Sequence, residues 1–192
     1  TTEELRRHYH ISGLFEPDEI CLTYSHQDRI IAGGVMPVEG ELKLESCKEL
    51  AAPYFLARRE LGAINIGGPG VLTVDGTEYQ LNSRDGIYVG MGAKELVFRS
   101  LEKDNPAKFY VNSSPAHRTC PTVLIPMDKA RYNHLGAQET VNERILRQYI
   151  HPAVCESCQL SMGMTALLPG NVWNTMPSHT HERRMEVYMY FD

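Results

Sequence analysis

The chain has 192 residues, of which 42% are hydrophobic, so it is long enough to bury a sizeable core. Its formal net charge of −5 and its lack of any basic block exclude the usual signature of a nucleic-acid-binding protein. Because the sequence has no run of 18 apolar residues and no signal-peptide pattern, we expect a cytoplasmic protein with no membrane partner.

Turn residues divide most of the chain into short β-prone runs, which predicts an all-β protein. Residues 71–81 should form a hairpin closed by Asp75-Gly76, since this dipeptide favours the tight turn between two antiparallel strands. Further strands are expected at residues 86–92, 96–100 and 109–112. Helical patterns are few, at residues 3–9 and 142–149, with a turn at 126–131. The fold class is therefore an antiparallel β-sandwich or barrel.

Five cysteines, an odd number, argue against the disulfide framework of a secreted protein. Cys155 and Cys158 form a C-x-x-C pair, but no second pair completes a zinc site and no βαβ pattern indicates a redox motif. We expect both to be structural thiols.

His179, His181 and Glu186 have the spacing of three ligands to one metal ion. Positions 179 and 181 place both imidazoles on the same face of an extended strand. Residues 182–184 can then turn the chain and return the Glu186 carboxylate on a neighbouring strand. Imidazole and carboxylate together suit Zn, Fe(II), Mn, Ni or Co and leave coordination positions open, so the pattern predicts a catalytic metal site.

An internal repeat relates this segment to an earlier one. Residues 54–66 can be laid over residues 179–191 without a gap, so that the two Arg-Arg pairs coincide. The three ligand positions are then occupied by Tyr54, Leu56 and Leu61, none of which binds a divalent cation usefully. The first half should therefore be a metal-free copy of the second.

The two copies differ in the length of chain beyond the motif. In the first copy, hairpins continue to about residue 112, whereas the second copy ends at Asp192 directly after its motif. An aromatic strand at 187–191 would then be an unpaired edge. We expect the chain to be a fragment of a longer protein.

The motif His-x-His-x₄-Glu in β-prone surroundings is similar to the first metal motif of the cupin superfamily, and two copies resemble a bicupin. More specifically, the chain resembles the 5-keto-4-deoxyuronate isomerase family. The resemblance is carried by YSHQDRIIAGG at 24–34, RRELGAINIGG at 58–68, SPAHRT at 114–119, CQLSMG at 158–163 and WNTMPSHTHERRMEVY at 173–188.

The resemblance implies two tandem antiparallel β-sandwich or jelly-roll barrels, the second incomplete. Residues 1–112 would be a metal-free cupin-like domain, and residues 113–192 a linker with the first part of a metal-binding cupin domain. It also implies a homohexamer with one zinc ion per subunit, held by His179, His181, Glu186 and a further His beyond Asp192. The activity implied is a ketol-isomerase of pectin breakdown, which converts an open-chain uronate aldehyde into a 2-ketone.

A uronate substrate carries a carboxylate, and Arg183 and Arg184 stand beside the ligands. A guanidinium matches a carboxylate with two parallel hydrogen bonds, so either arginine is a candidate substrate-binding residue. The sequence does not identify the general base, for which Glu182, His26 and Tyr190 are candidates. Two other functions stay open: a different cupin metalloenzyme, such as an Fe(II) dioxygenase, and a non-catalytic sugar-binding bicupin.

Overall fold

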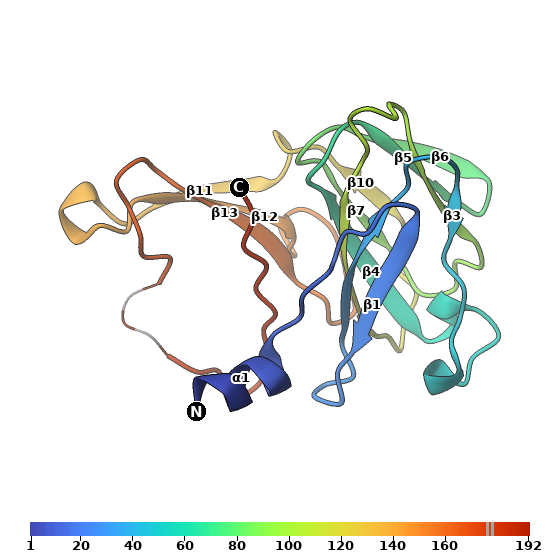
Figure 1. The fold of residues 1–192 in the computed structure, drawn as a ribbon, viewed down its shortest axis with the longest axis horizontal. Helices are drawn as coiled ribbons and strands as arrows, with labels where there is room; N and C mark the ends of the chain where they lie inside the picture. The colour runs from blue at the N-terminus through green and yellow to red at the C-terminus, as the bar shows by residue number, and fades with distance from the viewer. Residues whose placement is uncertain (176, 178) are drawn as a thin grey trace.

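Antiparallel strands are the main regular secondary structure of the computed structural model, which describes residues 1–175, 177 and 179–192. Within these residues, three sheets account for all of the strand pairing (Figure 1). The prediction of an antiparallel all-β protein is confirmed. No helix in the described part of the chain is long and apolar enough to cross a membrane.

Two sheets lie face to face and enclose the first core. The six-stranded sheet has the order β1 (Glu19–Tyr24), β2 (Ile31–Met36), β9 (Phe109–Pro115), β4 (Arg59–Asn65), β7 (Gly86–Val89) and β10 (Val123–Ile125). The four-stranded sheet has the order β3 (Leu42–Lys43), β8 (Leu96–Ser100), β5 (Gly70–Val74) and β6 (Thr77–Leu81). The remaining elements of this part are α1 (Thr2–Tyr9) and two short 3₁₀ turns, η1 (Lys48–Leu50) and η2 (Phe55–Ala57).

The third sheet extends to one side of this sandwich (left in Figure 1) and has three strands. Its order is β11 (Arg131–Leu135), β12 (Arg144–Ile150) and β13 (Met162–Leu167), and the 3₁₀ turn η3 (Gln138–Thr140) joins the first two.

Strand alternation explains how the six-stranded sheet serves two cores. Because successive side chains point to opposite faces, Leu61 and Ala63 of β4 enter the core between the two sheets of the sandwich, whereas Ile64 faces outward. The outward residues pack against the third sheet in a second core, which contains Ile64, Tyr88, Tyr110, Ile125, Tyr149, Ile150, Met162 and Met164. All seven residues of β4 are consequently buried.

A buried carboxylate joins the sandwich to the loop between β12 and β13. Glu60 on β4 is 0% exposed and accepts five hydrogen bonds. The Tyr88 hydroxyl donates at 2.7 Å and the Ser114 hydroxyl at 3.1 Å. Three consecutive backbone N–H groups, those of Cys158, Gln159 and Leu160, donate at 2.7, 2.6 and 2.6 Å. Burial and the bond to Glu60 raise the pKa of Tyr88, so its hydroxyl keeps the proton that it donates.

Several predicted elements are confirmed. The hairpin forms as β5 and β6, and both turn residues have positive φ, 47° at Asp75 and 83° at Gly76, as this turn type requires. The helix at 3–9 is α1, which starts with a capping box between Thr1 and Glu4.

The predicted helix at residues 142–149 is wrong, because this segment contains most of β12. Its arginines, glutamine and leucine are good helix formers, yet the strand lies between β11 and β13 and hydrogen-bonds with both. Tyr149 and Ile150 are each 1% exposed in the second core, so tertiary packing outweighs local propensity.

The structure also bears on the boundary expected at residues 112–113. Strand β9 runs through this position, and β10 still belongs to the six-stranded sheet. The sandwich thus uses residues up to Ile125, and the division of the chain into two cupin domains stays a prediction.

Replacing Glu60 with glutamine should destabilise the protein by about 3 kcal/mol, because the amide group would face donors and leave buried N–H groups without acceptors. Urea unfolding followed by fluorescence measures this. The control is Glu78→Gln on β6, whose ion pair with Arg99 is exposed and should change stability by less than about 0.5 kcal/mol. Equal effects of the two substitutions would contradict the anchoring role of Glu60.

Gly62→Ala should cost about 1–3 kcal/mol, because the added Cβ would overlap Cδ1 of Ile150 where β4 meets the second core. Adding Ile150→Val removes that methyl group, so the double variant should be more stable than the sum of the two single effects predicts. Gly40→Ala is the matched control, since no atom lies within 4 Å of its added Cβ. Strict additivity of the two substitutions in unfolding experiments would refute this contact.

Candidate metal centre

The predicted ligands lie on an irregular segment and not on a strand. Among the described residues after Trp173, no backbone-to-backbone hydrogen bond forms, so the shared strand face expected for His179 and His181 is wrong. A strand requires a neighbour that pairs with its N–H and C=O groups, and this segment has none in the described chain. Its Met185 N–H instead donates to the Asp28 carboxylate at 3.1 Å.

The side chains of the predicted ligands nevertheless lie close to one another in pairs. The ring of His179 stands edge-on to that of His181, with 4.8 Å between centroids and 88° between planes. His181 Nε2 lies 3.1 Å from Glu186 Oε1. His179 Nδ1 lies 3.1 Å from the Pro177 carbonyl oxygen, so an N–H there leaves Nε2 free to accept a metal.

These contacts are pairwise. No group of three or more His, Cys, Asp or Glu side chains converges closely enough to hold an ion within the described residues. The donors still fit a divalent metal in kind, since two imidazoles and a carboxylate are the ligands such ions prefer. The assignment of His179, His181 and Glu186 as ligands stays a prediction.

Arg184 occupies the space between two of the donors. Its Nη2 is 3.0 Å from Glu186 Oε1 and 3.1 Å from His181 Nε2, and its Nε also donates to Glu186 at 3.1 Å. A guanidinium therefore provides the positive charge beside these donors. Arg183, in contrast, has no hydrogen bond or ion pair with any described residue. Both arginines line a surface hollow with Gln27, Asp28 and Glu182.

Tyr188 also belongs to this site, although the sequence did not indicate it as a site residue. Its hydroxyl donates to Glu186 Oε2 at 3.0 Å, and its ring stacks on Tyr190 with centroids 6.3 Å apart. Burial would raise the pKa of Glu186, but the hydrogen bonds from Tyr188 and Arg184 and the neighbouring His181 outweigh it and lower that pKa. The spacing of two residues between Glu186 and Tyr188 in an extended run is the signal that could have indicated this pair.

The candidate bases differ in where they lie. Glu182 lines the hollow with Arg183, and the loop after β1, which carries His26, contributes Asp28 to the same hollow. The His26 ring stands edge-on to Tyr24, 5.5 Å away. Tyr190 is 87% exposed and borders a different pocket.

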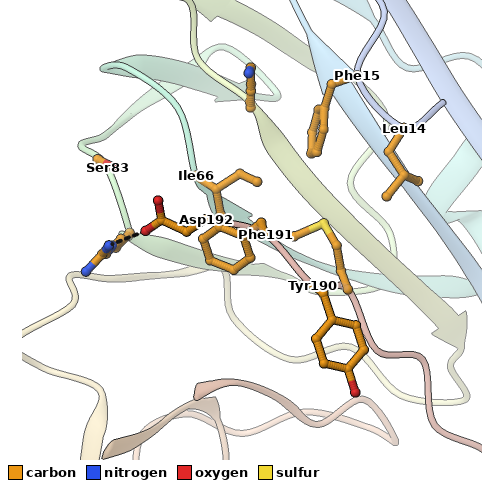
Figure 2. A pocket seen from close by; sticks show the side chains of 10 residues that line it. Leu14, Phe15, Ile66, Ser83, Tyr190, Phe191 and Asp192 are labelled. Carbon is orange, nitrogen blue, oxygen red and sulfur yellow. Dashed lines mark hydrogen bonds and ion pairs between the residues drawn. The ribbon is translucent and has the colours of Figure 1, made fainter. Parts of the chain in front are cut away.

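That second pocket shows how the end of the segment is held. Met189 and Phe191 lie beside Phe15 and Ile66 of the sandwich, as Figure 2 shows for the labelled residues. The Asp192 carboxylate pairs with Arg84 at 3.2 Å. The expected aromatic edge strand at 187–191 is therefore wrong, because side chains and not ladder hydrogen bonds attach this run to the protein.

Known proteins match this chain along nearly its whole length. Residues 11–191 match the KduI/IolB family. A protein of Lachnoclostridium phytofermentans is 57% identical over 192 residues, covering 100% of this chain and 70% of its own length. One of Yersinia enterocolitica is 54% identical over 193 residues, covering 100% and 69%. Both bear the name 4-deoxy-L-threo-5-hexosulose-uronate ketol-isomerase.

A solved structure, that of an IolB-like protein from Salmonella typhimurium LT2, shares the fold. It superposes with a TM-score of 0.53 over 70% of this chain and 50% of its own, at 15% sequence identity. The sequence matches extend beyond fold to family, and the family expected from the motifs is confirmed. The chain belongs to the KduI/IolB family, among whose members are enzymes named as ketol-isomerases.

Proposed function

We propose that this protein is a metal-dependent aldose–ketose isomerase that converts 5-dehydro-4-deoxy-D-glucuronate to 3-deoxy-D-glycero-2,5-hexodiulosonate in uronate and pectin degradation. The observation that carries the proposal is the identity of 52–57% over the whole chain with relatives named for this ketol-isomerase activity. The cluster of His179, His181 and Glu186 supplies donors suited to the chemistry.

The proposed cofactor is one zinc ion per subunit, held by His179 Nε2, His181 Nε2 and the Glu186 carboxylate. When bound, such an ion polarises the aldehyde and the adjacent hydroxyl and so favours proton loss at C2. Tyr188 would orient the Glu186 carboxylate through its hydrogen bond at 3.0 Å. Glu186 is committed as a ligand, which leaves the proton transfer to another residue.

Arg183 is the better candidate for the substrate carboxylate. Arg184 is engaged with Glu186 and His181, whereas Arg183 projects beside the same segment with no partner in the described chain. A guanidinium at the hollow can pair with the carboxylate in two parallel hydrogen bonds. Glu182 lines this hollow too, which makes it the first residue to test as the base.

The wider proposal is a bicupin that assembles as a homohexamer, with a metal-free first domain. Two of the three positions that the repeat aligns with ligands, Leu56 and Leu61, are 0% exposed in the first core, where an apolar side chain is suited to packing. The third sheet would be the first part of the metal-binding domain.

Elemental analysis of the purified protein should find about one zinc per subunit, and the double substitution His179→Ala with His181→Ala should abolish this content because two of the ligands are lost. His134→Ala is a matched control, since His134 pairs with Glu143 on the third sheet at 2.8 Å. Unchanged metal in the double variant would exclude the ligand assignment. A content near two ions would contradict a metal-free first domain.

Metal-replete protein should convert the 5-keto uronate to the 2-ketone, as followed by NMR. Glu186→Gln should lower kcat far more than it raises KM, because charge on the chelated oxygens develops in the transition state. Arg183→Ala should raise KM for uronates about tenfold without affecting any turnover of neutral aldoses, since only uronates carry the carboxylate. Arg131→Ala, on the third sheet beside His151, serves as the arginine control.

Absence of conversion by a full-length, metal-replete sample would refute the isomerase. Uronate binding without turnover would then indicate a sugar-binding protein, and oxygen consumption with Fe(II) would indicate a dioxygenase.

A further inference from the structure

Two sequence motifs that the proposed function does not use meet in the structure. SPAHRT at 114–119 begins at the end of β9, and CQLSMG at 158–163 leads into β13. His117 and Cys158, 41 positions apart, bring an imidazole Nδ1 to 3.1 Å from a thiol Sγ. A thiol beside an imidazole is the arrangement in which the base can remove the thiol proton.

A hydrogen-bond donor stands ready to stabilise charge that develops on this sulfur during reaction. The backbone N–H of His117 donates to Cys158 Sγ at 3.3 Å, in addition to the contact with the ring. Arg118 is the next residue in the sequence and donates to the Ser157 carbonyl at 2.8 Å. The opposing charge is Glu60, whose carboxylate already accepts five hydrogen bonds and is thereby compensated.

The pair is held in place from both sides. The Cys158 N–H is fixed on Glu60, and the side-chain amide of Gln159 donates to the Pro115 carbonyl at 2.8 Å. Together with the bond from Arg118 to Ser157, this joins the two motifs next to the sulfur. Little reorganisation is needed for proton transfer, since the donor and acceptor are already at hydrogen-bond distance.

None of the other four cysteines hydrogen-bonds with an imidazole among the described residues; Cys21, part-buried like Cys158, points to the Glu19 carboxylate at 4.0 Å. Cys155 and Cys120 are buried, and burial raises the pKa of the Cys155 thiol, which points to the Tyr149 carbonyl. Cys155 and Cys158 therefore do not act as one C-x-x-C unit. Cys47 is more exposed than Cys158 but makes no side-chain hydrogen bond in the described chain, which makes it a natural reference for an accessible thiol.

We propose that His117 and Cys158 form a thiol–imidazole pair that makes Cys158 the site at which this protein reacts with small disulfides. The thiol proton passes to His117 Nδ1, and the thiolate Sγ attacks one sulfur of the disulfide. A new Sγ–S bond forms as the S–S bond of the reagent breaks, and its second sulfur leaves as a thiolate. The result is a mixed disulfide at residue 158.

The test treats the intact protein with dithiodipyridine at pH 7 and assigns the adducts by peptide mass mapping over time. Cys158 should react about tenfold faster than Cys47 although it is less exposed, because an imidazole at hydrogen-bond distance can take the thiol proton. Cys120 and Cys155 should react slowly, which reports that the fold is intact. A Cys158 rate equal to or below that of Cys47 would overturn the proposal.

His117→Gln removes the base and keeps a polar side chain of similar size. It should slow the reaction of Cys158 about tenfold while the Cys47 rate stays the same. The control is His151→Gln, which removes an imidazole that lies beside Arg131. An unchanged Cys158 rate in a folded His117→Gln variant would also overturn the proposal. Should fast labelling of Cys120 show that this variant is unfolded, the comparison of Cys158 with Cys47 in the unchanged protein decides.

Discussion

The Glu60 carboxylate is the contact on which the arrangement of the two cores depends. It lies on a strand whose alternate residues fill the core of the sandwich, and on its own side it receives three consecutive amides from the loop before β13. A buried charge costs several kcal/mol unless it is fully hydrogen-bonded, so this loop must adopt the one conformation that satisfies it. The third sheet continues directly from that loop, and its position is set by the same constraint.

Side-chain packing on the same face of β4 also fixes the position of the third sheet. Gly62, two residues along on the same face, leaves room for Ile150, Leu160 and Met162, and an added Cβ would meet all three. Ile64 continues the apolar surface. Along one face of β4, Glu60 binds the loop, Gly62 leaves space for side chains of the second core, and Ile64 packs against that core. No residue of β4 is therefore exposed.

Local signals predicted the features that local chemistry determines. Asp75-Gly76 specified its turn, and the capping residues Thr1 and Glu4 lie at the start of a helix that the sequence also indicated. The segment at 142–149 was predicted as a helix because its propensity is helical, whereas its strand form depends on hydrogen bonds to the strands on both sides, β11 and β13. The contacts of Cys158 with His117 and Glu60 span 41 and 98 positions, and no periodicity in the sequence encodes them.

The metal motif shows both outcomes at once. His179 contacts His181 and His181 contacts Glu186, but their assignment as ligands of one ion stays a prediction. The strand expected to present them is absent from the described residues, because no neighbour pairs with that segment. Residue types and short spacing carry information about which groups can meet. The backbone that brings them together depends on partners elsewhere in the fold.

Arg184 would compete with a metal ion for His181 and Glu186. Its guanidinium holds His181 Nε2 and Glu186 Oε1, so any ion that takes these two donors must first displace it. The displaced guanidinium is then free to receive an anion. By thermodynamic linkage, a carboxylate that captures Arg184 would strengthen ion binding by the same factor by which the ion strengthens carboxylate binding. Under such an exchange, a cation and a small anion would each increase the occupancy of the other through Arg184, while Arg183 remains the proposed contact for the substrate carboxylate.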